Sequence, residues 1–167
     1  MPGVACCRFC ADYTPALRFP MTFNEGNLCR GIPGKRFNSS IIEYQDGYLM
    51  AFRNGWAGSE IYVVRMDKDF KPQKEAIQLQ LRTKDCAYGR EDPRLFWHDG
   101  ALHLAFIGVF GRQKIVRTHQ MYARLADDLT VAHVCLPKYA KRNSWEKNWQ
   151  FFENNKDWKL MSVFVTA

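Results

Sequence analysis

The chain has 167 residues, of which 47% are hydrophobic and 25% charged, and this ordinary globular composition excludes a disordered or fibrous chain. The formal net charge is +7, but the basic residues are scattered and form no Lys/Arg run. A small anionic ligand or a solvated surface therefore accounts for the charge as well as a polynucleotide does, and no specific nucleic-acid partner is predicted. No apolar run approaches a membrane span, so no membrane partner is predicted either.

Residues 1–35 carry no strong pattern and are expected to form an N-terminal strap. They lack a basic region followed by an apolar one, so no secretory signal is expected, and we predict a reduced, cytoplasmic location. Cys7 and Cys10 form a C-x-x-C, but no second pair at metal-ligand spacing follows. We therefore predict no metal site and no cofactor.

Two segments of the chain, residues 38–52 and 91–106, repeat one pattern. Each is an apolar run, an Asp-Gly dipeptide and a second apolar run, which is typical of a β-hairpin. Aligning Asp46-Gly47 with Asp99-Gly100 places Asn38 over Glu91. Both copies continue with a Gly-rich patch, a further strand and a closing Asp, and a third copy begins near residue 148.

Periods near 50 residues with about four short strands each are typical of β-propeller blades. We predict an all-β chain in which residues 36–167 form a partial propeller, with blades at about 36–88, 89–144 and 145–167. A β-sandwich is the competing all-β fold, but it does not predict such regular repetition. Propellers usually need at least four blades, so either self-association completes the ring or the chain is truncated, and we favour truncation.

The first strand of each propeller blade lies nearest the central channel, so the starts of these strands converge at one end of it. The repeat places Asn38-Ser39, Glu91-Asp92 and Asn148-Trp149 there. We predict Asp92 as the catalytic residue, because a carboxylate in a channel mouth can act as a general acid. In the competing interpretation, Glu91, Asp92 and Arg94 form an ion-pair network that links blades. The residues predicted to contact substrate are Asn38, Ser39, Glu91, Arg94, Trp56 and Asn148.

Three basic residues are candidates for binding a phosphate group. Arg53 is expected after the second strand, beside the Gly-rich loop that contains Trp56, and its planar guanidinium could hold a phosphate or carboxylate. An arginine that braces the loop is an equally good interpretation. Lys147 could add a second positive charge to the same pocket. Arg124 is the weakest of the three, because a solvated strand end explains it better.

The segments FNSSIIEYQDGYLMAFR, GREDPRLFWHDGALHLAFIG and WEKNWQFFE, in this order, resemble glycoside hydrolase family 130, the mannoside phosphorylases and mannosidases. The resemblance implies a five-bladed propeller that acts on β-mannosides with inversion, and Asp92 as the catalytic acid. It also implies that Asn38 contacts the sugar and that Arg53, Lys147 and Arg124 bind phosphate. Inorganic phosphate would then be a co-substrate.

The sequence departs from the family in two ways. Further phosphate-site residues of the family belong to later blades, which this sequence does not contain, so phosphorylase and hydrolase stay open. Ser39-Ser40 after Asn38 is unusual, which leaves the substrate open. We expect a carbohydrate-active enzyme. The alternatives are a non-catalytic carbohydrate-binding or interaction propeller, an inactive truncated relative, or a protein that binds nucleic acid through its basic surface.

Overall fold

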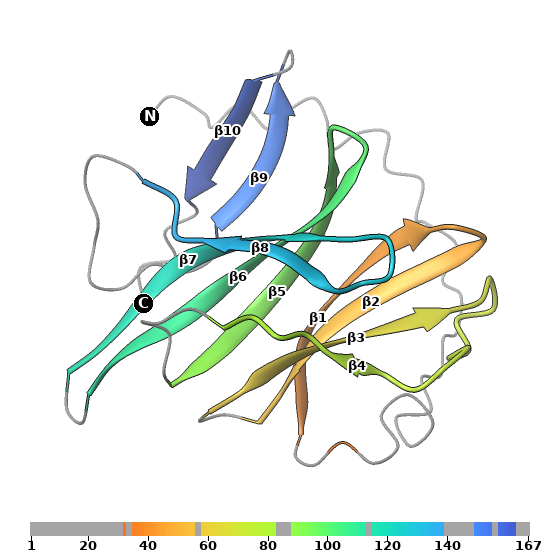
Figure 1. Cartoon of the computed structure of the whole chain (residues 1–167), viewed down its shortest axis with the longest axis horizontal. Coiled ribbons are helices and arrows are strands. Elements are labelled where there is room, and N and C mark those ends of the chain that lie inside the picture. Colours follow the sequence, from red (N-terminus) through yellow and green to blue (C-terminus); the bar gives the residue numbers. More distant parts are fainter. Residues whose placement is uncertain are drawn as a thin grey trace, which may run out of the picture.

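The structure is a computed structural model that describes Ile32 and residues 35–55, 58–82, 88–112, 115–138, 149–154 and 157–162 (Figure 1). Every regular element in these residues is a β-strand, so the all-β prediction is confirmed. The strands form two four-stranded antiparallel sheets and one two-stranded hairpin. Within the same residues there is no helix with the length and hydrophobicity needed to cross a membrane.

Each four-stranded sheet is a meander, in which every strand pairs with the next one in the sequence. The first sheet contains β1 (Arg36–Tyr44), β2 (Gly47–Asn54), β3 (Glu60–Met66) and β4 (Ile77–Gln78). The second sheet contains β5 (Gly89–His98), β6 (Ala101–Arg112), β7 (Ile115–Leu125) and β8 (Val131–Cys135). The hairpin consists of β9 (Trp149–Asn154) and β10 (Asp157–Ser162).

The first strands of the two sheets carry the same irregularity at matched positions. In β1, Phe37 pairs with Arg53 and Ser40 with Ala51, so two residues bulge out opposite one. The same register shift recurs in β5 between Glu91 and Arg94. The structural repeat therefore places Asn38 over Asp92, whereas the aligned Asp-Gly dipeptides had placed it over Glu91.

The two alignments differ by a single position because the two Asp-Gly dipeptides play different roles. In the first hairpin the turn residues are Gln45 and Asp46, and Gly47 is already the first residue of β2. A Cβ atom on Gly47 would lie 2.2 Å from the carbonyl oxygen of Met66, so close strand packing requires glycine there. In the second hairpin Gly100 is itself a turn residue, with a φ of 68°.

The main hydrophobic core lies between the two sheets, which pack face to back. From the first sheet, Leu49 and Ala51 of β2 face this core, and from the second sheet Leu104 and Phe106 of β6 face it. In the repeat that the bulges define, Leu49 and Ala51 correspond to His103 and Ala105, which alternate with Leu104 and Phe106 and so lie on the opposite face. Each sheet thus contributes a different face to the contact.

A second hydrophobic cluster covers the outer face of the first sheet. Its buried members are Met50, Phe52, Val64 and Met66. The central strand β2 is consequently buried on both faces. In the second sheet, β6 also has buried residues on both faces, and both strands have nearly continuous apolar sequences.

Candidate functional site

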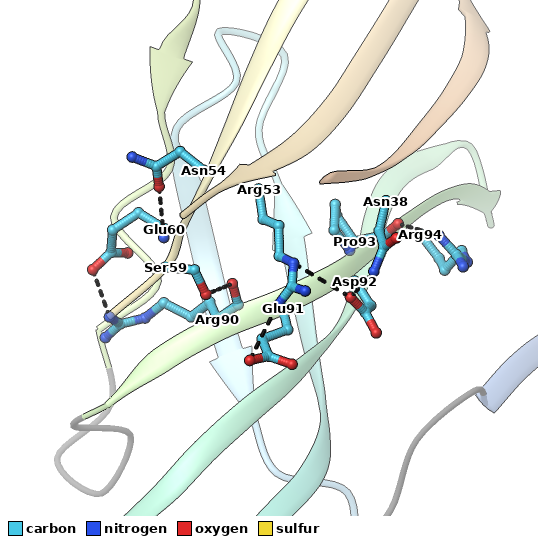
Figure 2. Close-up of polar contacts among 10 residues, drawn as sticks. All are labelled: Asn38, Arg53, Asn54, Ser59, Glu60, Arg90, Glu91, Asp92, Pro93 and Arg94. Atoms are coloured by element: carbon cyan, nitrogen blue, oxygen red, sulfur yellow. Dashed lines mark hydrogen bonds and ion pairs between the residues drawn. The ribbon is translucent and has the colours of Figure 1, made fainter. Parts of the chain in front are cut away.

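Four of the predicted site residues, Asn38, Arg53, Glu91 and Asp92, meet where β5 begins beside β1 and the end of β2 (Figure 2). Asp92 lies in the bulge of β5, and Asn38 lies in the corresponding bulge of β1. The Asn38 side-chain amide donates a hydrogen bond to Oδ1 of Asp92. This bond joins the first strands of the two sheets.

The bulges themselves explain why these two side chains face each other. Asn38 and Asp92 have φ angles of 49° and 52°, in the left-handed region that Asn and Asp tolerate better than most side chains. A bulge turns one side chain out of the regular alternation of the strand. Pro93 fits the second bulge because β5 is the edge strand of its sheet, where a missing N–H group breaks no ladder hydrogen bond.

Arg53 supplies the positive charge of the site. It lies inside β2 rather than after it, and only 5% of its surface is exposed. Its Nη1 atom is 3.0 Å from Oε1 of Glu91, and its Nε atom is 3.6 Å from Oδ1 of Asp92. The side chains of Glu91 and Asp92 are 16% and 17% exposed, so these ion pairs are less screened by water than surface pairs. Figure 2 shows the guanidinium between the two carboxylates.

Two other predicted residues, at the starts of β1 and β5, are exposed, as Asn38 is. Ser39 is exposed next to Asn38 in the bulge. Arg94 is exposed as well, and its Nη1 atom donates to the carbonyl oxygen of Pro93 at 3.1 Å. The cation that pairs with Glu91 and Asp92 is therefore Arg53, whereas the sequence had suggested Arg94 for such a network.

The structure does not bring Arg124 to this site. Arg124 pairs with His103 on β6 and His133 on β8, near the hairpin end of the second sheet. The bulge that holds Asp92 lies opposite Phe106, which is roughly 10 Å further along the strands and on the other side of β6. The predictions for Trp56, Lys147 and Asn148 fall outside the described residues.

Sequence reasoning missed Arg90, which anchors the start of β5 to the first sheet. Its Nη1 atom donates to Oε1 of Glu60 at 2.8 Å, and its Nε atom donates to the carbonyl oxygen of Leu81 at 3.0 Å. Its backbone also exchanges hydrogen bonds with Ser59, through the backbone carbonyl and the hydroxyl group. No local pattern marks Arg90 in the sequence, because its burial and its partners arise from the packing of β5 on the first sheet.

Chemically, the site offers a carboxylate that is held by an amide donor and a guanidinium at the junction of two sheets. Such a group can bind a hydroxyl-rich ligand or transfer a proton to it. Among the described residues there is no group of three or more His, Cys, Asp or Glu side chains that could hold a metal ion.

Comparison of the chain with protein-family models, with curated proteins and with solved structures finds no match.

Proposed function

We propose that the two four-stranded sheets are consecutive blades of a five-bladed β-propeller, with β9 and β10 in a third blade. Three features support this arrangement: the meander order of each sheet, the matched bulges at Asn38 and Asp92, and the face-to-back packing. A rotational repeat stacks the same two unlike faces at every contact, as these sheets do. In this arrangement β1 and β5 line the central channel, with Asn38 and Asp92 at one end of it.

On this scaffold we propose a carbohydrate-active enzyme of the type of glycoside hydrolase family 130, acting on β-mannosides or related glycosides in the cytoplasm. The observation that carries the proposal is the Asp92 carboxylate, held between Asn38 and Arg53 at the junction of two first strands. Position and orientation of an acid are what glycosidic bond cleavage requires of the protein.

In the proposed reaction Asp92 donates a proton to the glycosidic oxygen as the bond from that oxygen to the anomeric carbon breaks. Phosphate or water attacks the anomeric carbon from the opposite face, which inverts its configuration. Inverting hydrolysis also needs a base to activate water. Phosphate is already an anionic nucleophile, so phosphorolysis needs only one acid and cations that hold the phosphate.

The proposal assigns the neighbouring residues to binding. Asn38 is positioned to contact the sugar while it holds Asp92, and Ser39, Glu91 and Arg94 lie beside it. Arg53 is the cation in contact with Asp92, so it both orients the carboxylate and contributes positive charge for phosphate. Trp56, Asn148 and Lys147 keep the sugar-binding and phosphate-binding roles that the family resemblance implies, whereas Arg124 lies away from Asp92 and is left out of the proposed phosphate site.

The test is turnover of a panel of β-mannosides, measured as sugar 1-phosphate release with inorganic phosphate and as free sugar release without it. Asp92→Asn keeps the size of the side chain but removes the proton, so turnover is expected to fall about 100-fold or more. Asp69→Asn is the control. Asp69 lies in the turn after β3 and 78% of its side chain is exposed, so turnover should not change.

A non-catalytic carbohydrate-binding or interaction propeller is the second candidate. It is favoured by the ion pairs of Arg53 with both Glu91 and Asp92, which would also serve to link two blades. Sugar binding without turnover, unchanged in Asp92→Asn by calorimetry, would support this candidate. Turnover that Asp92→Asn leaves intact would instead remove Asp92 from the role of acid.

A further inference from the structure

The outer face of the second sheet, which points away from the first sheet, carries a cluster of four rings. We call Phe96, His98, His103 and Tyr122 the His103 cluster. The ring centroid of His103 lies 5.6 Å from that of Phe96 and 5.1 Å from that of Tyr122. The Tyr122 hydroxyl and Nδ1 of His103 share a hydrogen bond of 2.5 Å. His103 is only 5% exposed, so this pair is largely shielded from water.

The structural repeat relates this cluster to the face through which the first sheet contacts the second. Tyr122 corresponds to Val63 because each pairs with the alanine of its central strand, Ala105 or Ala51. The corresponding pairs are Leu49 and His103, Ile42 and Phe96, Tyr44 and His98, and Val63 and Tyr122. All four first-sheet members of these pairs pack in the core between the sheets. The His103 cluster therefore lies on the face of the second sheet that corresponds to the contact face of the first sheet.

We propose that the His103 cluster is the docking face for the sheet to which β9 and β10 belong, and that this sheet docks only while His103 is neutral. The existing contact supports the third sheet as the occupant, because the corresponding face of the first sheet already packs against the second sheet. Burial supports it too, since Thr118 and Gln120 on β7 are each 2% exposed beside the cluster. Phe96, His98 and Tyr122 each have a further interaction.

The charge state of His103 matters because its surroundings penalise a proton. Burial lowers the pKa of His103, and the positive charges of His98 on β5 and Arg124 on β7 lower it further. A backbone hydrogen bond at His98 and the carboxylate of Asp99 in the β5–β6 turn act in the opposite direction. Burial raises the pKa of both Tyr122 and Cys135 on β8, so these two groups stay neutral in mild acid. His133, which pairs with Arg124, is the remaining titratable side chain on β8 and is exposed.

The direction of the pH effect follows from linkage. Burial is the main cause that lowers the pKa of His103 below its ordinary value of about 6.5. The proposal takes this buried state as the docked one, so an undocked state that exposes the imidazole to water would bind the proton more readily. The docked state is then fully stable at neutral pH and loses stability as the pH falls below about 6.5 toward the lower pKa of the docked form. At the corresponding place in the first sheet, Leu49 cannot titrate, so the contact between the first two sheets lacks this response.

The experiment follows amide hydrogen exchange by NMR between pH 7.5 and pH 5, with the amides of β2 and β3 as an internal reference. In the wild-type chain, protection of the β9 and β10 amides should fall relative to the reference, by up to about tenfold for each pH unit that separates the two pKa values. The imidazole signals of His103 should titrate with the same midpoint. His103→Leu, which copies the first sheet, should keep β9 and β10 protected at pH 5.

Two further variants keep the proposal falsifiable. His103→Gln cannot be protonated but retains a polar side chain, so it should also abolish the loss of protection if leucine proves too disruptive. His133→Leu is the control, because His133 is exposed, and the loss at pH 5 should persist. Three results would overturn the proposal: β9 and β10 unprotected at every pH, a loss that survives in both His103 variants, or His103 titrating while β9 and β10 stay protected. The test depends on the blade arrangement but not on any activity toward sugars.

Discussion

At the scale of single residues, the left-handed backbone at Asn38 and Asp92 determines what the site can do. An L-residue in this region costs roughly 1–2 kcal/mol, and Asn and Asp tolerate it best because their short side chains hydrogen-bond locally. The same bulge in two neighbouring strands points an amide and a carboxylate at each other. Backbone strain of this kind is often found at functional sites, where neighbouring structure holds it in place.

Substitutions at Asn38 should separate the backbone strain from the hydrogen bond. Both Asn38→Gly and Asn38→Val remove the amide that binds Asp92, but only glycine accepts a φ of 49° without strain. We expect the valine variant to be less stable than the glycine variant by about 2 kcal/mol in urea unfolding. Equal stability of the two variants would mean that the bulge is not held in its left-handed form.

At the scale of elements, the two hairpins show why the sequence predicts strands better than register. Asp-Gly occurs in both, and the dipeptide alone predicts the same turn twice. In the structure the first turn has positive φ only at Gln45, whereas the second has it at both Asp99 and Gly100. The difference arises from the contact of Gly47 with the Met66 carbonyl on β3, which no pattern local to the hairpin reveals.

Alanine substitutions at the two glycines should therefore have unequal costs. A Cβ atom at position 47 would collide with backbone atoms of Met66 and Asp67, which cannot move aside like a flexible side chain, so Gly47→Ala should cost about 3 kcal/mol. At position 100 no atom lies within 4 Å, and Gly100→Ala should cost about 1 kcal/mol from its positive φ alone. Thermal unfolding of both variants checks this order, which a larger loss for Gly100→Ala would contradict.

At the scale of the whole molecule, polar contacts fix the two sheets at both ends of the hydrophobic core. Near the candidate site, Arg90 reaches Glu60 and the Leu81 carbonyl. At the hairpin end, the Tyr44 hydroxyl donates to the carbonyl oxygen of Asp127 at 2.9 Å. Apolar packing alone would let one sheet slide on the other, whereas these directional bonds select a single alignment.

Removal of Arg90 tests how much one such contact contributes. Arg90→Ala leaves the partly buried Glu60 carboxylate and the Leu81 carbonyl without this donor, so we expect a loss of about 3 kcal/mol in the free energy of unfolding. Arg94→Ala, at an exposed arginine of the same strand, should change it by less than about 0.5 kcal/mol.

A double variant decides whether the charge of Glu60 is the cause. Glu60→Gln in the Arg90→Ala background should recover part of the loss, because a neutral amide is less costly to leave without its cation. If the double variant is as unstable as Arg90→Ala, the Leu81 carbonyl and lost packing account for the effect instead.

Only part of the candidate site can be recognised from the sequence. Asn38, Asp92 and Arg53 stand out because they flank repeated hairpins, and the structure brings these three together. Arg90 and His103 do not stand out, because their importance comes from sheet packing that joins residues far apart in the chain. Trp56, Lys147 and Asn148 stay predictions, and so does the chemistry of the site.

The face-to-back contact has a consequence for how such a chain could evolve. When two sheets pair through the same face, both copies of that face are buried, and an additional copy has no matching face to bind. Here the first sheet contributes one face to the contact and the second sheet contributes the opposite face, so in the proposed propeller a gene duplication that inserts one more repeat would find its binding surface already present. Growth and shortening of the array by whole units would then be the easiest changes for this architecture to survive.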